Sequence, residues 1–351
     1  MHAKKFYQKN SCFFCYSFGK AFLYKKRFVL KNICFFDQTF FVKESLLCNL
    51  WLKLKTVWEL TRAEHGLMYG CGVLIGIIIA DKTVLFSEFA LFGFCTAFLL
   101  EAGTFALNDY YDLESDIANR RTDRPLVRGE LRKEEALLIA CGAIAAGLAF
   151  AVFLNRICFA LAVILAVMGV LYDIKMKEFI AVSNFYIAAT MAIPFIFGGL
   201  LAYAPERTEM MQPLLILAAI AFFAGFGREV MKDMGDVKGD EVRDVRSIAR
   251  VYGMEKAMHV TIFSYFLAVV LSAVPFFIGD TPYFHNPAYI VPVMAADVLL
   301  MHTCLGLKLK SFRKRFDSKT VSLDINYKYL RKETLIALGI GLIAFVSGAL
   351  V

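Results

Sequence analysis

Two segments of this 351-residue chain carry carboxylates at helical spacing, and these side chains are the best placed to do chemistry. In the first segment three polar side chains recur every four residues: Asn108, Asp112 and Asp116. In the second, four carboxylates would fall within an arc of about 60° on a helix: Glu229, Asp233, Asp236 and Asp240. Since a step of four residues nearly completes a helical turn, each segment predicts a stripe of carboxylates on one helix face.

The two acidic stripes predict a site for divalent cations. Carboxylates held together repel one another and are poorly solvated near a bilayer, so a bound cation would stabilise them. Mg²⁺ prefers oxygen ligands and commonly shares its coordination shell with substrate phosphates. We therefore expect two or more Mg²⁺ ions to clamp a diphosphate. The expected ligands are Asn108, Asp112, Asp116, Asp233, Asp236 and Asp240, all except Asp233 being expected catalytic residues. The alternative is a solvated acidic helix end paired with arginines.

Basic side chains beside the stripes support the diphosphate interpretation. Cations together with metal ions stabilise a departing phosphate. Three basic residues are expected to contact the diphosphate oxygens: Arg124, Lys177 and Lys232. Arg62 and Arg128 would then remain for a second phosphate, and Tyr172 lies in the same short connection as Lys177. A metal-binding scaffold without catalysis would not need these cations.

The composition of the chain identifies the elements that must position these residues. Hydrophobic residues make up 59% and the mean hydropathy is +0.59, against roughly 45–50% apolar residues in ordinary globular proteins. This excludes a disordered chain and disfavours a soluble multidomain enzyme. The nine cysteines are scattered, several of them in apolar runs, which argues against a disulfide scaffold.

Nine apolar stretches approach the roughly 20 residues needed to cross a bilayer. Helix is expected throughout, because lipid offers the backbone no hydrogen-bond partner and the stretches lack the alternation of barrel strands. The fold class is therefore all-α, a polytopic bundle of nine transmembrane helices. The predicted spans are Glu59–Ala80, Leu85–Leu107, Ala136–Leu154, Ile157–Tyr172, Ile180–Ala202, Pro213–Phe226, Ala257–Ile278, Pro287–Leu307 and Leu335–Val351.

The distribution of Lys and Arg predicts the orientation. With nine spans, 36 of the 39 basic residues fall on one side of the membrane, and the other side keeps only Lys82, Arg156 and Arg207. The basic side is expected to be cytoplasmic, and both acidic stripes lie on it. We expect a multi-pass protein of the cell membrane whose active site faces the cytoplasm. The net charge of +8 is then explained by topology and membrane lipids, not by nucleic acid.

Residues 1–55 differ from the rest of the chain. Lysines and an arginine interrupt their apolar run, so the segment is a poor signal peptide, and a single Cys12-x-x-Cys15 pair binds no structural zinc alone. We expect a peripheral or poorly ordered extension, or a start placed upstream of the native one, before a transmembrane domain over residues 56–351.

Glu101 is the one clear charge that we find inside the predicted spans. A cation-coupled transporter is the rival class of protein, but transporter sites usually lie near the bilayer midplane on broken helices. Here the charges gather at one face. Glu101 is either a coupling residue or a carboxyl hydrogen-bonded inside the bundle near its cavity, and we favour the second interpretation.

The motifs resemble those of the UbiA superfamily of intramembrane prenyltransferases over about Glu59 to Val351. Asn108-Asp-x-x-Asp112-x-x-x-Asp116 resembles the first Asp-rich motif of that family, and Asp236-x-x-x-Asp240 the second. Further segments are similar to its substrate-binding positions: Leu60-Thr-Arg62, Asp123-Arg124-Pro125, Tyr172 with Lys177, and Asn184. The resemblance implies a helical bundle around a central, lipid-open cavity and Mg²⁺-dependent transfer from a polyprenyl diphosphate donor.

Within the superfamily, the segment from Arg228 to Asp240 is most similar to the archaeal branch that makes digeranylgeranylglyceryl phosphate. This resemblance implies a lipid-phosphate acceptor, geranylgeranylglyceryl phosphate, whose hydroxyl forms an ether with a geranylgeranyl group. An aromatic acceptor, as in quinone biosynthesis, is the alternative. The acceptor proton would pass to a carboxylate of the first stripe or to the released diphosphate, and the sequence does not decide between them.

Overall fold

The computed structural model describes residues 50–118, 120–176, 179, 182–202, 211–242, 247–279, 281–316 and 327–350. Within these ranges no side chain is described for residues 236, 238–242, 310–316 and 328. The chain divides into two units, Met1–Lys55 and Thr56–Val351. Of the first unit only residues 50–55 are described, and they are helical.

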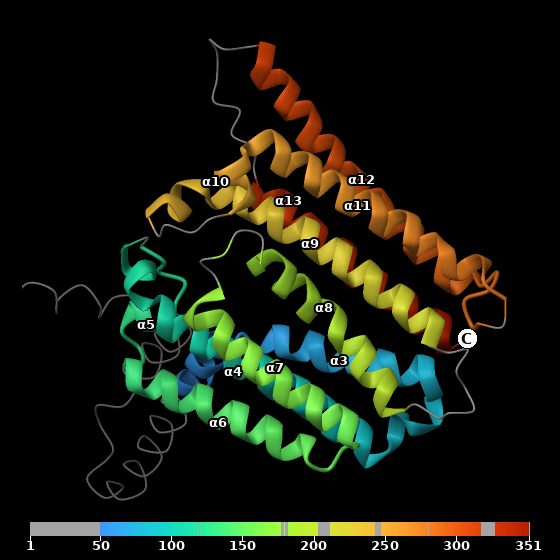
Figure 1. Cartoon of the computed structure of the whole chain (residues 1–351), viewed down its shortest axis with the longest axis horizontal. Helices are drawn as coiled ribbons and strands as arrows, with labels where there is room; N and C mark the ends of the chain where they lie inside the picture. Colours follow the sequence, from blue (N-terminus) through green and yellow to red (C-terminus); the bar gives the residue numbers. More distant parts are fainter. Residues whose placement is uncertain are drawn as a thin grey trace, which may run out of the picture. The chain divides into compact units, whose positions relative to one another are not determined.

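The second unit is built from helices joined by short connections (Figure 1). After helical residues 56–61 the elements are α3 (Ala63–Asp81), the 3-10 helix η1 (Lys82–Phe86), α4 (Glu88–Ala118), α5 (Pro125–Arg128), α6 (Lys133–Ala151), α7 (Arg156–Ile174), α8 (Val182–Leu201), α9 (Met211–Val242), α10 (Ile248–Tyr252), α11 (Met254–Phe277), α12 (Pro287–Phe316) and α13 (Tyr327–Leu350). The described residues contain no strand.

Nine of the described helices are long and apolar enough to cross a membrane, which confirms the all-α prediction and its nine spans. Four helices extend well beyond their predicted spans: α4 and α9 continue through the polar motifs that follow, α12 continues to Phe316, and α13 begins at Tyr327. The first span begins at Ala63 rather than at Glu59. The reason is Arg62, whose left-handed conformation (φ 44°, ψ 54°) separates residues 56–61 from α3.

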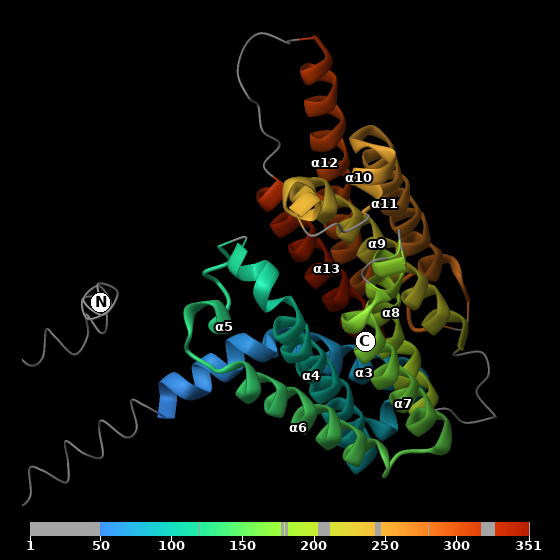
Figure 2. The same cartoon turned by 60° about the vertical axis from the view of Figure 1, so that its left-hand side comes forward.

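Helices α3 and α8 pack closely against each other, and the two acid-bearing helices pack on this pair (Figures 1 and 2). A Cβ atom on Gly76 would lie 2.2 Å from the Phe195 carbonyl oxygen, and one on Gly198 would lie 2.0 Å from the Val73 carbonyl oxygen. Only glycine fits at these two crossings, and small residues commonly allow membrane helices to approach closely. Helix α8 also packs on α9, while α4 packs on α3, α6 and α7. Both acid-bearing helices are thereby tied to the α3–α8 pair.

Candidate active site

The first acidic stripe lies on one uninterrupted helix, as predicted from its spacing. Helix α4 continues to Ala118, so Asn108, Asp112 and Asp116 share one face. Asp116 is buried, and the other two are half-buried. The Asn108 Nδ2 amide donates a hydrogen bond of 2.9 Å to Oδ1 of Asp173, at the end of α7. This bond leaves the Asn108 carbonyl oxygen as its potential metal ligand.

Asp109, the residue that follows Asn108, forms ion pairs with two arginines. Its carboxylate is 1% exposed, and its Oδ1 atom lies 2.9 Å from Nη2 of Arg62 and 3.0 Å from Nη1 of Arg124. The Arg62 guanidinium also lies 4.3 Å from the centre of the Phe105 ring. Arg124 precedes α5, and its Nε lies 3.8 Å from Oδ2 of Asp116. A buried anion thus brings two predicted substrate-binding cations to the acidic stripe.

The second stripe lies on α9, and its described members have local or nearby partners. Glu229 is buried between Arg228, at 3.3 Å, and Lys232, at 2.9 Å. Asp233 accepts a hydrogen bond of 2.7 Å from Nδ2 of Asn184, a residue predicted to bind substrate. Asp236 and Asp240 continue the same helix by their backbone. Their side chains, and the whole of Lys177, lie outside the described part of the structure.

The two stripes approach each other around Tyr172. This side chain on α7 lies within electrostatic range of four carboxylates from three helices: Asp112, Asp173, Glu229 and Asp233. Its ring stacks on that of Tyr186, with centroids 4.7 Å apart. The fold therefore brings carboxylates of α4, α7 and α9, which are far apart in the sequence, near one side chain.

Arg128 has a different position from the one expected of a phosphate-binding cation. Its guanidinium contacts Glu59, and its Nε lies 2.7 Å from Glu130. These bonds hold helical residues 56–61 to the loop after α5, so Arg128 is committed to carboxylates of the chain itself. In the loop before α5, the hydrogen bonds from the Arg121 guanidinium hold the pKa of Asp123 below its ordinary value.

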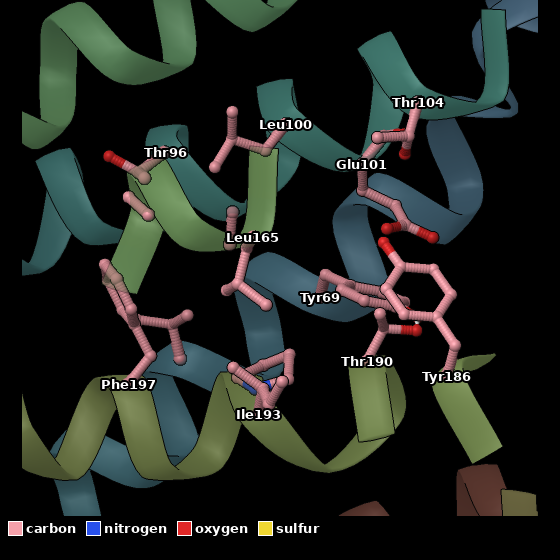
Figure 3. Close-up of a pocket in the computed structure, with 14 residues that line it drawn as sticks. Tyr69, Thr96, Leu100, Glu101, Thr104, Leu165, Tyr186, Thr190, Ile193 and Phe197 are labelled. Carbon is pink, nitrogen blue, oxygen red and sulfur yellow. Dashed lines mark hydrogen bonds between the residues drawn. The ribbon is translucent and has the colours of Figure 1, made fainter. Parts of the chain in front are cut away.

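Two cavities extend from this region into the membrane-spanning part. The larger has about 1070 Å³ of empty space, partly open to the surroundings, among α3, α8, α9, α11, α12 and α13, and is mainly apolar, with His65 and Arg228 in its wall. The smaller has about 560 Å³ of partly open space among α3, α4, α7 and α8 (Figure 3). Tyr69 and Pro194 line both cavities and therefore stand between them.

Sequence reasoning missed three carboxylates, of which Asp109 and Asp173 are buried and Asp297 is half-buried. Asp109 was overlooked because it lies outside the four-residue rhythm of its motif, and Asp173 because it stands alone at a helix end. Asp297 of α12 lines the larger cavity and accepts a 2.8 Å hydrogen bond from Ser272, so Glu101 is not the only carboxyl inside the spans. A single aspartate hardly lowers the mean hydropathy of an apolar span. An ionisable residue inside a span nevertheless indicates a functional position, and Asp297 could have been singled out on that ground.

The described side chains offer the oxygen ligands that Mg²⁺ prefers, but they do not enclose an ion by themselves. In the described residues no three His, Cys, Asp or Glu side chains come together as a metal site. Asn184 donates a hydrogen bond to Asp233 through its Nδ2 atom. Its buried Oδ1 atom has no hydrogen-bond partner among the described atoms. Such an atom fits a ligand shell completed by the remaining α9 carboxylates and by substrate oxygens.

Comparison with known proteins decides the family. Residues 71–322 match the model of the UbiA prenyltransferase family. The chain belongs to this family. Among curated relatives, digeranylgeranylglyceryl phosphate synthase of Archaeoglobus fulgidus is 42% identical over 84% of this chain and 96% of its own length. The corresponding enzyme of Methanopyrus kandleri is 30% identical over 72% of this chain and 89% of its own.

Solved structures agree with this assignment. A structure of digeranylgeranylglyceryl phosphate synthase aligns with a TM-score of 0.64 at 27% identity, covering 85% of this chain and 98% of that one. A UbiA homologue from Archaeoglobus fulgidus, solved with GPP and Mg²⁺, aligns at 0.58 over 84% of this chain and 100% of its own, and at 17% identity it supports the fold alone. This UbiA family member is therefore a multi-pass membrane prenyltransferase, and it is similar to the archaeal digeranylgeranylglyceryl phosphate synthases.

Proposed function

We propose that this prenyltransferase transfers a geranylgeranyl group from its diphosphate to the free hydroxyl of geranylgeranylglyceryl phosphate, in a reaction that requires Mg²⁺. The product would be digeranylgeranylglyceryl phosphate, an ether-lipid precursor. The observation that carries the proposal is the meeting of two acidic helices and two arginines near a long apolar cavity. The 42% identity to the Archaeoglobus fulgidus synthase supports the choice of substrates.

Asn108, Asp112, Asp116, Asp233, Asp236 and Asp240 would hold the metal ions. When bound, Mg²⁺ would neutralise the diphosphate and the charge that develops on it as it leaves. The fit rests on the chemistry of the donors: carboxylates on α4 and α9, the Asn108 amide oxygen on α4, and Asn184 Oδ1 on α8, which has no hydrogen-bond partner among the described atoms. Lys177 and Lys232 would add cationic contacts to the donor diphosphate.

Arg124 and Arg62 can bind phosphate while they keep their ion pairs with Asp109. Each guanidinium has five N–H donors, and the contact to Asp109 uses one nitrogen of each. We assign Arg124 to the donor diphosphate, because it also approaches Asp116. Arg62, at the start of α3, is assigned to the phosphate of the acceptor. Tyr172 and Asn184 would fix these groups from α7 and α8.

The apolar cavity would receive an isoprenoid chain and exclude water from the reacting carbon. Its walls come mainly from aliphatic and aromatic residues, for example Met68, Phe195, Leu217, Leu300 and Phe345. An allylic centre that has begun to lose its diphosphate reacts readily with water, so a dry wall directs it toward the acceptor.

We place this chemistry in the unit formed by residues 56–351 and treat residues 1–55 as a peripheral extension. We also place the protein in the cell membrane with its site toward the cytoplasm. The support is the bias of basic residues, 36 of 39 on the side where both acidic stripes end. Labelling of single introduced cysteines in intact cells, at Glu114 and at Lys82, would test this orientation.

The direct test uses purified protein in nanodiscs with Mg²⁺ and radiolabelled geranylgeranyl diphosphate. Geranylgeranylglyceryl phosphate and 4-hydroxybenzoate are offered as separate acceptors. The proposal predicts a labelled product with the glyceryl phosphate only. Brisk prenylation of 4-hydroxybenzoate with none of the glyceryl phosphate would contradict the acceptor assignment and leave the prenyltransferase assignment intact.

A further inference from the structure

The smaller cavity contains a carboxyl group that the proposed metal and phosphate site does not use. Glu101 of α4 projects into it inside a membrane-spanning helix (Figure 3). An ionisable side chain at such a depth is costly in lipid and usually serves a function with a specific partner. Here the Tyr69 hydroxyl lies near the carboxyl, in the wall of the same cavity.

Glu101 lies beneath the first acidic stripe on the same face of α4. It precedes Asn108 by seven residues and Asp112 by eleven, and both steps return to within about 20° of the same direction on a helix. Seven residues correspond to a rise of about 10.5 Å. The carboxyl is therefore aligned with the predicted metal ligands but displaced toward the membrane interior.

A pair of tyrosine rings joins this cavity to the acidic site. Tyr186 lines the cavity and stacks on Tyr172, the residue around which the two stripes meet. Asp173, which holds Asn108, is also within electrostatic range of Glu101. The wall of the cavity thus adjoins the acidic site through these two stacked rings.

The polar groups of the cavity suit an alcohol. Tyr69 and Thr190 place their hydroxyl oxygens 3.0 Å apart. Thr96 is 1% exposed, and its Oγ1 atom has no hydrogen-bond partner among the described atoms. Burying a hydroxyl without a hydrogen-bond partner is unfavourable, so a ligand with a hydroxyl group would stabilise it. No lysine, arginine or histidine is among the lining residues, so nothing there would attract a phosphate.

We propose that Glu101 is a catalytic residue that binds the hydroxyl group of the lipid acceptor and takes its proton. This inference rests on the proposed function. As the donor's C–O bond to the diphosphate breaks, its electron pair leaves with the diphosphate. The acceptor oxygen forms the new ether bond to the same carbon, and the hydroxyl proton passes to a Glu101 carboxylate oxygen. The proton leaves Glu101 before the next turnover.

The separation along α4 has the right size for this role. A near-attack contact between the acceptor oxygen and the reacting carbon is about 3–3.5 Å. The hydrogen bond from that oxygen to a carboxylate is about 2.5–2.7 Å. Within a rise of about 10.5 Å, these two contacts leave room for the diphosphate end that links the carbon to the metal ligands.

The test compares Glu101→Gln with the wild type in nanodiscs, with Mg²⁺, geranylgeranyl diphosphate and geranylgeranylglyceryl phosphate. Glutamine has nearly the same shape but cannot take the proton, so kcat should fall by at least about 100-fold. The Kd of a non-transferable thiodiphosphate analogue of the donor should stay within about twofold. Glu333→Gln is the matched control: it alters a buried carboxyl that contacts His302 and Thr303 and lines neither cavity, and its kcat should stay near the wild-type value.

A folded Glu101→Gln protein with kcat within about threefold of the wild type would overturn the inference. An unchanged kcat with a raised acceptor KM would also overturn it, because binding alone would then be lost. If the variant does not fold, Tyr69→Phe decides: loss of the hydroxyl beside the carboxyl should lower kcat by about tenfold, and an unchanged kcat would overturn the role. A wild-type protein that transfers nothing to the glyceryl phosphate would contradict the proposed function itself.

Discussion

Asp109 and Glu229 are both buried carboxylates that contact two cations, but the cations come from different parts of the chain. Asp109 contacts Arg62 and Arg124, which lie 47 residues before it and 15 residues after it. Glu229 contacts Arg228 and Lys232 on its own helix. The first cluster exists only when α3, α4 and the loop before α5 have packed together, whereas α9 can form the second by itself.

This difference indicates different roles for the two clusters. The tertiary fold brings the guanidinium groups of Arg62 and Arg124 to Asp109. Both groups keep N–H donors that can bind a ligand. Arg228 and Lys232 neutralise Glu229 from the same helix without help from the rest of the fold, and Lys232 keeps N–H donors for the diphosphate. We therefore expect Asp109 to organise phosphate binding and Glu229 to stabilise α9, while the metal-facing carboxylates of the two helices act together.

The largest expected effects come from one metal-facing carboxylate on each helix. Asp112→Ala and Asp236→Ala should each lower the rate of transfer by at least about 100-fold, since each removes stabilisation of the leaving diphosphate. Glu114→Ala is the matched control, because Glu114 is exposed on another face of α4. Steady-state rates and thermal unfolding of each variant provide the measurement. A folded variant of either aspartate with near-native turnover would show that it is only a solvated helix residue.

The next test compares the two carboxylates directly. Asp109→Asn should release Arg62 and Arg124 and lower kcat/KM by roughly tenfold to a hundredfold, because charge-assisted bonds are worth about 1.5–3 kcal/mol. Glu229→Gln leaves two cations beside a neutral side chain and should mainly lower the thermal stability of the protein. Measuring kcat/KM and Tm for both variants checks this separation, and equal effects on both quantities would remove the distinction between the clusters.

A smaller and more selective effect is expected for Arg62→Gln. If Arg62 binds the acceptor phosphate, its loss should raise the acceptor KM by about tenfold and the donor KM much less. Titrating each substrate at saturating levels of the other gives the two constants. Arg128→Gln serves as the control, because Arg128 contacts Glu59 and Glu130. Equal increases in both KM values for Arg62→Gln would place this residue at the donor instead.

The smallest effect is expected from removing Met1 to Val42. That segment contains no residue of either acidic stripe, and Asp109, Glu229 and their cations all lie after Lys55. The truncated protein should transfer geranylgeranyl groups at about the full-length rate. Specific activity of the two purified proteins is the measurement, and loss of turnover in a folded truncation would mean that the extension shapes the site.

Periodicity and charge predicted the fold and the helix that carries the first stripe because these properties are local. The four-residue spacing placed Asn108, Asp112 and Asp116 on one face, and α4 does continue through them. Long-range pairs were not predictable: the bonds of Asn108 to Asp173 and of Asn184 to Asp233 join residues 65 and 49 positions apart. The backbone turn at Arg62 also escaped prediction, since an arginine rarely adopts the left-handed conformation.

The most direct test of the central claim, that α4 and α9 bind a diphosphate jointly through divalent cations, is a donor-binding titration. A thiodiphosphate analogue of geranylgeranyl diphosphate is titrated into the purified protein by calorimetry, with Mg²⁺ or with EDTA, for the wild type, Asp112→Asn and Asp233→Asn. The account predicts tight binding with Mg²⁺, loss of binding in EDTA, and weakening of Mg²⁺-dependent binding by either substitution. Equal affinity in Mg²⁺ and EDTA, or a requirement for only one of the two helices, would contradict it.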